Sequence, residues 1–151
     1  MNDEQATQKG KNLTFNVDNE TYGFEIKYVR QIIGLQEITP VPEQPRYIKG
    51  IINLRGQIIP IMDIRLKFQK EEKDYDDRTC IIVLDVEELS IGVIVDRVSE
   101  VIEIDDANIT DAPEFNQDIS DRYIRGIGKI GEKVVILLDC KQLIKHGEIK
   151  R

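Results

Sequence analysis

The sequence contains few of the residues from which enzyme and metal sites are usually built. It has no tryptophan, two cysteines and one histidine. His146 lies in a polar stretch near the end of the chain, which favours a solvated residue at a helix end over a catalytic base. Cys80 and Cys140 are far apart and lie in apolar segments, which predicts buried thiols in a reducing cytosol. Because metal sites need clustered ligands, we expect neither a metal nor a cofactor.

Positive charge and long apolar runs are also scarce. The chain has 21 Lys and Arg against 28 Asp and Glu, which argues against a nucleic-acid partner and against a polybasic membrane anchor. No apolar run approaches the ~20 residues that a membrane-spanning helix needs. The polar residues 1–12 lack the apolar segment of a signal peptide. We therefore expect a flexible N-terminal tail and no insertion into a membrane.

Sequence motifs of catalysis are absent as well. The chain has no dinucleotide-binding glycine motif, no P-loop and no nucleophile elbow. The glycine-rich segment 125–133 lacks the strand-to-helix context of a phosphate loop and favours a hairpin. The acidic pairs at 76–77 and 105–106 lack the spacing of an EF-hand and are interpreted as solvated. With no nucleophile–base pair, the sequence favours an interaction protein over an enzyme.

Short strand-like segments dominate the chain. They are rich in Ile, Val and aromatic residues and are bounded by turn residues: 13–17, 21–26, 50–54, 57–64, 79–86, 89–95, 123–130 and 133–139. Two further segments, 25–33 and 94–102, space their apolar residues as a helix does. A last helix is expected over 140–147, ending at Gly147. Polar residues predict a solvated connection over 69–78 and a long loop over 105–121, so we expect an all-β fold with short helices.

The chain contains an internal repeat. Residues 47–68 align without a gap with residues 123–144, and five residues are identical in the two segments: Tyr47 and Tyr123, Ile48 and Ile124, Gly50 and Gly126, Ile51 and Ile127, and Asp63 and Asp139. Earlier in the chain, at a smaller offset, Gly23, Val29 and Ile33 match Gly92, Val98 and Ile102. We therefore expect two similar β-units, with approximate halves 13–68 and 79–145, in one domain over residues 13–145.

Residues that recur in both halves are interpreted as structural. Gly50 and Gly126 are expected at a bulge or at a close approach of the backbone. Asp63 and Asp139 are expected to cap or close a turn at the end of a strand.

The sequence NLRG at residues 53–56 occurs only in the first half. The second half has Gly131 where Arg55 would lie, so the shared unit does not require an arginine there. This difference favours a binding role for Arg55. The alternatives are a solvated turn arginine and an intramolecular pair with a carboxylate.

The segment YIKGIINLRGQIIPIMDIRLKF, residues 47–68, resembles the CheW-like domain of bacterial chemotaxis. It combines IKG, NLRG and a proline followed by DIR, and the similarity extends over residues 13 to 145. The resemblance implies two intertwined, five-stranded SH3-like β-barrel subdomains packed together, with a short C-terminal helix and no catalysis. The chain starts with Met and is little longer than the domain, so we expect a free-standing coupling protein. The alternatives are a regulatory module of a kinase or related scaffold and, from another class, a small-ligand-binding β-barrel.

The resemblance also implies partners. It implies an adaptor that links the cytoplasmic tips of methyl-accepting chemotaxis receptors to the regulatory domain of the histidine kinase CheA, in the cytoplasm at membrane-associated arrays. The implied kinase-binding residues are Ile38, Thr39 and Val41. The implied receptor-binding residues line a groove between the barrels: Val29, Gln31, Ile32, Arg55, Gly56, Val98 and Val101.

Two reservations apply to the implied receptor-binding residues. Gln31 stands where the family commonly has Glu, which weakens any charge pair there, although the amide still donates and accepts hydrogen bonds. For Val29, Ile32, Val98 and Val101 the competing interpretation is core packing, because spacing alone does not say which apolar residues lie on the surface.

Overall fold

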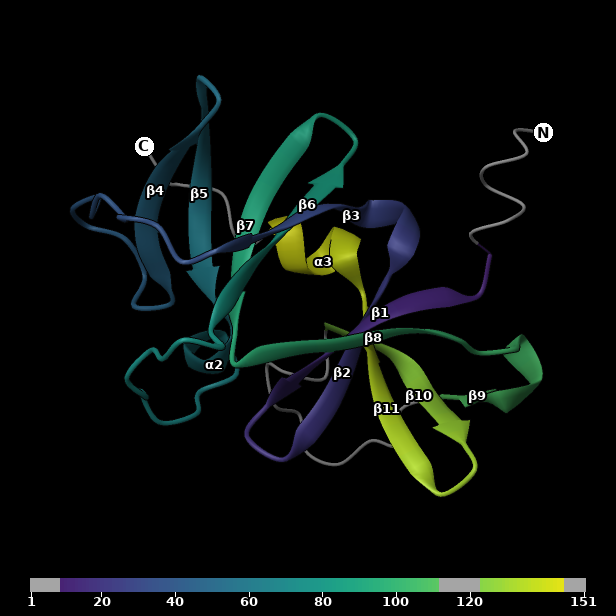
Figure 1. Cartoon of the computed structure of the whole chain (residues 1–151). Helices are drawn as coiled ribbons and strands as arrows, with labels where there is room; N and C mark the ends of the chain where they lie inside the picture. The colour runs from purple at the N-terminus through teal and green to yellow at the C-terminus, as the bar shows by residue number, and fades with distance from the viewer. Residues whose placement is uncertain (1–8, 112–122, 146–151) are drawn as a thin grey trace.

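The structure is a computed structural model of the chain, and it describes residues 9–111 and 123–145. These residues form two β-sheets that pack on each other, with a short helix between them (Figure 1). The six-stranded sheet has the order β8-β1-β2-β11-β10-β9, and the five-stranded sheet has the order β3-β6-β7-β5-β4. The strands are β1 (Lys11–Val17), β2 (Glu20–Glu25), β3 (Val29–Gly34), β4 (Ile48–Leu54), β5 (Gln57–Asp63), β6 (Cys80–Val86), β7 (Leu89–Val95), β8 (Arg97–Glu103), β9 (Ile109–Thr110), β10 (Ile124–Ile130) and β11 (Lys133–Leu138).

Four short helices complete the described part of the chain. Two are 3-10 turns and two are α-helical: η1 (Ile26–Tyr28), α2 (Ile64–Lys67), η2 (Asp106–Asn108) and α3 (Cys140–Lys145). The prediction of a mostly-β fold with a short C-terminal helix is confirmed. One sheet has six strands rather than five because the two-residue β9 pairs with β10. Gly147 and residues 112–121 of the expected long loop lie outside the described residues.

The predictions of helices over 25–33 and 94–102 are wrong. The first segment is η1 followed by the strand β3, and the second lies mostly in β8. Both strands contain a β-bulge, between Val29 and Gln31 in β3 and between Val98 and Val101 in β8. A bulge adds one residue to the two-residue period of a strand. Apolar residues on one face then lie three apart, which is the spacing that suggested helices.

The two halves of the chain exchange strands. The six-stranded sheet combines β1 and β2 from the first half with β8 to β11 from the second, and the five-stranded sheet combines β6 and β7 with β3 to β5. The chain changes sheet twice, through η1 between β2 and β3 and through Asp96 between β7 and β8. Parallel pairs join the halves within each sheet, β11 with β2 and β5 with β7. Each half therefore contributes to both sheets.

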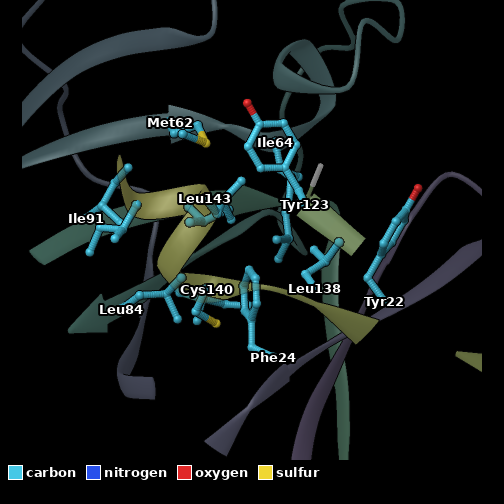
Figure 2. Close-up of a cluster of buried hydrophobic side chains, with 14 of the residues drawn as sticks. Tyr22, Phe24, Met62, Ile64, Leu84, Ile91, Tyr123, Leu138, Cys140 and Leu143 are labelled. Atoms are coloured by element: carbon cyan, nitrogen blue, oxygen red, sulfur yellow. The ribbon is translucent and has the colours of Figure 1, made fainter. Parts of the chain in front are cut away.

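The largest apolar core lies between the sheets. It contains 19 buried residues in the described chain, against 7 for the core inside the five-stranded sheet and 3 for the core inside the six-stranded sheet. Figure 2 shows Cys140 and Leu143 of α3 among Phe24 of β2, Met62 of β5 and Leu138 of β11. Each fully buried side chain of this kind contributes about 1.5–3 kcal/mol, so the contact between the sheets dominates the stability of the fold.

The recurring aspartates occupy equivalent corners of the fold. The backbone N–H of Asp63 donates to the carbonyl of Tyr47 at 2.8 Å, and that of Asp139 donates to the carbonyl of Tyr123 at 2.7 Å. The Asp63 carboxylate also accepts from the N–H of Arg65 at 2.9 Å, and the Asp139 carboxylate from that of Gln142 at 3.1 Å. Each aspartate thus joins the end of a strand to the start of a helix.

The recurring glycines lie at β-bulges where the backbone comes close to another segment. The register shifts between Ile48 and Gly50 in β4, and between Ile124 and Gly126 in β10. Gly50 has a φ of +144°, and a Cβ there would lie 2.1 Å from the Thr39 carbonyl oxygen. Thr39 forms an isolated bridge with Ile51, so this close approach holds the segment before β4 against the sheet.

Replacing Gly50 should destabilise the fold strongly. We expect Gly50→Ala to lower the free energy of unfolding by about 3 kcal/mol, because the new Cβ forces Thr39 away from β4. Urea denaturation monitored by circular dichroism measures the effect. Gly34→Ala is the matched control, since a Cβ at Gly34 meets nothing within 4 Å. An equal loss in both variants would contradict this account.

A buried arginine joins the two sheets near Asp96, where the chain passes from β7 to β8. The Arg65 side chain is 7% exposed, and its Nη2 lies 2.8 Å from Asp18 Oδ1 and 2.6 Å from Asp96 Oδ2. Asp18 is in the turn between β1 and β2 of the six-stranded sheet, while Arg65 follows β5 of the five-stranded sheet. The hydrogen bond from Arg65 lowers the pKa of the Asp18 carboxyl below its ordinary value.

Because of this ion pair, we expect the free energy of unfolding to depend on pH in the acidic range. Because the pKa of Asp18 is lower in the folded chain than in the unfolded chain, its contribution is present above about pH 4 and is lost as the pH falls through the folded value. We expect the difference in unfolding free energy between the wild type and Asp18→Asn to shrink as the pH falls from about 5 to about 2. Urea denaturation at a series of pH values measures this difference, and a constant difference would refute the prediction.

Candidate functional site

Two edge strands, one from each sheet, border the core between the sheets. β3 is an edge of the five-stranded sheet and β8 is an edge of the six-stranded sheet. Val29 pairs with Leu84 and Val98 pairs with Phe15, and both partners belong to the core between the sheets. Val29 and Val98 are half-buried and pack against that core. The two valines that match in the sequence repeat therefore occupy matching positions at the margin of one core.

Ile32 and Val101 lie one step farther along the same two strands. Ile32 pairs with Ile82 and Val101 pairs with Leu13, so both side chains lie on the face of the core between the sheets. They are 46% and 51% exposed, respectively. We call Val29, Ile32, Val98 and Val101 together the β3–β8 rim. An exposed apolar rim beside a closed core is typical of a surface that another protein covers.

Gln31 does not belong to the rim. It pairs with Val83, whose side chain lies in the core inside the five-stranded sheet. Paired residues of neighbouring strands point to the same face, so Gln31 lies on the face opposite to Val29 and Ile32. The bulge between Val29 and Gln31 produces this change of face.

Arg55 and Gly56 form a two-residue turn between β4 and β5. Their φ values are +52° and +89°, which is the pattern of a type I′ hairpin turn. The N–H of Gly56 donates to Asn53 Oδ1 at 2.8 Å. Arg55 is exposed, and no carboxylate among residues 9–111 and 123–145 lies within ion-pair distance of it. The intramolecular pair considered as an alternative is therefore absent from the described chain.

A positive φ is a property of these turns and not of the arginine. The first turn residue of each of the other three hairpins also has a φ between +55° and +58°: Asp18, Glu87 and Gly131. A residue other than glycine in this conformation costs about 1–2 kcal/mol. The first half thus carries an arginine at a position that glycine would occupy with less strain.

Polar side chains connect the Arg55 turn to β3. Arg30 donates from Nη1 to Gln57 Oε1 at 2.6 Å, and Gln57 directly follows Gly56. Gln57 in turn donates from Nε2 to Ser90 Oγ of β7 at 3.3 Å. The turn and the start of the rim therefore belong to the same end of the five-stranded sheet.

The residues implied in kinase binding lie at the opposite edge of that sheet. Ile38, Thr39 and Val41 precede β4, which is the edge strand farthest from β3. Thr39 pairs with Ile51 and is exposed, while Ile38 packs partly against the core inside the sheet. The two predicted surfaces thus involve the two different edge strands of this sheet.

The described residues offer little reactive chemistry. No group of three or more His, Cys, Asp or Glu side chains within them could hold a metal ion. Burial raises the pKa of both the Cys80 and the Cys140 thiol above the ordinary value. No helix in this part of the chain is long and apolar enough to cross a membrane.

Sequence reasoning missed the ion-pair cluster of Arg65, Asp18 and Asp96. Arg65 lies two residues after the recurring Asp63, but the aligned residue of the second half, Lys141, is also basic, so the sequence does not mark Arg65 as buried. The two aspartates lie far from Arg65 in sequence, and nothing in their own surroundings singles them out.

The fold and the site define a two-sheet β protein with exposed apolar side chains at one margin of its core and an exposed arginine on a hairpin turn. Residues 11–148 match the CheW-like domain, and the chain belongs to that family. It is similar to a chemotaxis protein CheW of Klebsiella aerogenes, with 39% identity over 91% of this chain and 82% of the relative. A chemotaxis protein CheW of Treponema pallidum is 31% identical over 100% of this chain and 89% of the relative.

A solved structure supports the same family membership. The crystal structure of the scaffolding protein TtCheW from Thermoanaerobacter tengcongensis superposes with a TM-score of 0.80 at 34% sequence identity. The match covers 86% of this chain and 88% of the other. The two-sheet arrangement is therefore the fold of this family.

If Arg55 serves contact rather than folding, its removal should not harm stability. We expect Arg55→Gly to raise the free energy of unfolding by about 1 kcal/mol, because glycine adopts the positive φ without strain. Urea denaturation measures this effect. Glu87→Gly is the matched control, since Glu87 has a φ of +58° at the equivalent place in another hairpin. Destabilisation by Arg55→Gly alone would make the arginine structural.

Proposed function

We propose that this protein is a non-catalytic adaptor that couples methyl-accepting chemotaxis receptors to the histidine kinase CheA in cytoplasmic signalling arrays. Relatives with this fold are named chemotaxis proteins CheW and a scaffolding protein. The observation that carries the proposal is the β3–β8 rim, in which each sheet contributes one half-buried and one exposed apolar residue to the margin of a common core.

The rim suits a helical partner. A receptor tip is a helical hairpin, and an amphipathic helix binds by placing apolar side chains against an apolar surface. Ile32 and Val101 are the exposed residues that such a helix would cover. Arg55 lies on a turn linked to β3 and has no ion-pair partner among the described residues, which suits an anchor that pairs with polar groups of the receptor.

The second partner would dock elsewhere. Ile38, Thr39 and Val41 lie at the β4 edge, across the five-stranded sheet from β3. We propose that this edge receives the regulatory domain of CheA. Surfaces at opposite edges of one sheet can be occupied at the same time, which is the requirement for an adaptor.

Binding measurements with the full chain test both surfaces. We expect micromolar or tighter binding to a receptor tip fragment and to the CheA regulatory domain, and no ATPase activity. Ile32→Asp, Val101→Asp and Arg55→Asp should each weaken receptor binding by about 2 kcal/mol without weakening kinase binding. Thr39→Arg should have the reverse effect, because it places a bulky charge at the β4 edge. Isothermal titration calorimetry measures each affinity.

The control for the receptor surface is Val134→Asp. Val134 is 52% exposed, as Val101 is, but it lies on β11 outside the rim. Loss of receptor binding in this variant as well would contradict the assignment of receptor binding to the β3–β8 rim. Failure of the wild-type chain to bind either partner at micromolar concentration would refute the adaptor function.

A further inference from the structure

The shape of the rim depends on how the two sheets are held together. Val29 and Ile32 belong to one sheet, and Val98 and Val101 belong to the other. β8 reaches the six-stranded sheet directly from β7, with Asp96 as the single residue between the two strands. The position of Asp96 therefore fixes where the Val98 side of the rim begins.

Three hydrogen bonds hold Asp96. Its Oδ2 accepts from Arg65 Nη2 at 2.6 Å and from the backbone N–H of Asp18 at 2.8 Å. Its own N–H donates to the carbonyl of Asn16 at 3.2 Å. The carboxylate thus joins the turn between β1 and β2 to the arginine that follows β5, at the point where the chain changes sheet.

Arg65 is suited to this task because it is buried and paired with two carboxylates. Its side chain is 7% exposed, whereas those of Asp18 and Asp96 are 45% and 24% exposed. Burial of the guanidinium is costly unless carboxylates offset its charge, and moving either carboxylate away weakens that compensation. The two neighbouring lysines, Lys70 and Lys73, approach the same carboxylates at 3.7 and 4.0 Å.

The cluster is an addition to the repeated fold unit. Lys141, the residue aligned with Arg65, is exposed. Where the chain passes from β2 to β3, the neighbouring ion pair is that of Arg125 Nε with Glu25 Oε1 at 3.4 Å, and both residues belong to the six-stranded sheet. The fold unit therefore forms without an Arg65, as it does without an Arg55.

We infer that Arg65 and Asp96 are positioning residues for the receptor surface, which hold β8 against the core and so set the Val98–Val101 side of the rim relative to β3. This inference rests on the proposed function. We expect kinase docking not to depend on it, because Thr39 pairs with Ile51 of β4 and Ile38 packs against the core inside the five-stranded sheet.

The chain contains its own reporter for the position of β8. Cys80 is half-buried and packs against the core between the sheets. The backbone N–H of Val98 acts to lower the pKa of this thiol, against the effect of burial, so β8 borders Cys80. Cys140 is 1% exposed within the same core. Local release of β8 exposes Cys80 alone, whereas general unfolding exposes both thiols.

The test uses the full chain and the variants Arg65→Met and Asp96→Asn. Labelling of the native protein with a thiol reagent, with the modified residue identified by mass spectrometry, measures the position of β8. Titration with a receptor tip fragment and with the CheA regulatory domain measures function. Glu72→Gln is the control, because it removes an ion pair with Lys49 at 3.2 Å on the surface. Asp96→Asn keeps the size of the side chain and carries the test if Arg65→Met does not fold.

We expect Cys80 labelling to accelerate about tenfold while Cys140 stays protected. Receptor affinity should fall about tenfold, with kinase affinity within about twofold of the wild type. Unchanged Cys80 labelling overturns the inference, as does an equal loss of both affinities together with labelling of both thiols. If the wild type binds no receptor tip, the proposed function fails, while the Cys80 labelling still decides whether the cluster holds β8.

Discussion

The apolar contact between the two sheets is the constraint on which the rest of this structure depends. Neither sheet has a large core of its own, and most buried apolar side chains lie where the sheets meet. The β3–β8 rim is the margin of this contact, where the sheets end and apolar side chains become exposed. The surface proposed for receptor binding is therefore a continuation of the folding core. Partner binding would extend the burial that already stabilises the fold.

Charged residues secure the same contact at its edges. The chain passes between the sheets twice. At one passage Arg65 pairs with Asp96, and near the other Arg125 of β10 lies 3.4 Å from Glu25 of β2 within the six-stranded sheet. These pairs lie at the crossings rather than in the centre of the core, where desolvation of the charges would be most costly. Apolar contact thus supplies the attraction between the sheets, and the Arg65 ion pairs join the two sheets where the chain passes from β7 to β8.

Much of this architecture could be predicted from the sequence. The strand segments and the C-terminal helix follow from composition and turn residues, and the repeat singled out Gly50 and Asp63 together with their equivalents. The repeat alone does not predict the exchange of strands, because it shows that two halves are alike but not which half completes which sheet. The bulges in β3 and β8 were also missed. One inserted residue gives Val29 and Ile32 a helix-like spacing and turns Gln31 to the opposite face, and periodicity alone does not distinguish these cases.

The exchange of strands has a consequence for how the chain can fold. β2 finds its parallel neighbour only in β11, and β1 finds its outer neighbour only in β8. Many native contacts therefore join residues far apart in sequence, and chains of such high contact order fold slowly. During synthesis the six-stranded sheet cannot close until β11 has left the ribosome. The arrangement has the geometry of a domain-swapped dimer whose two subunits have become one chain, so the halves cannot be separated into independently folding modules.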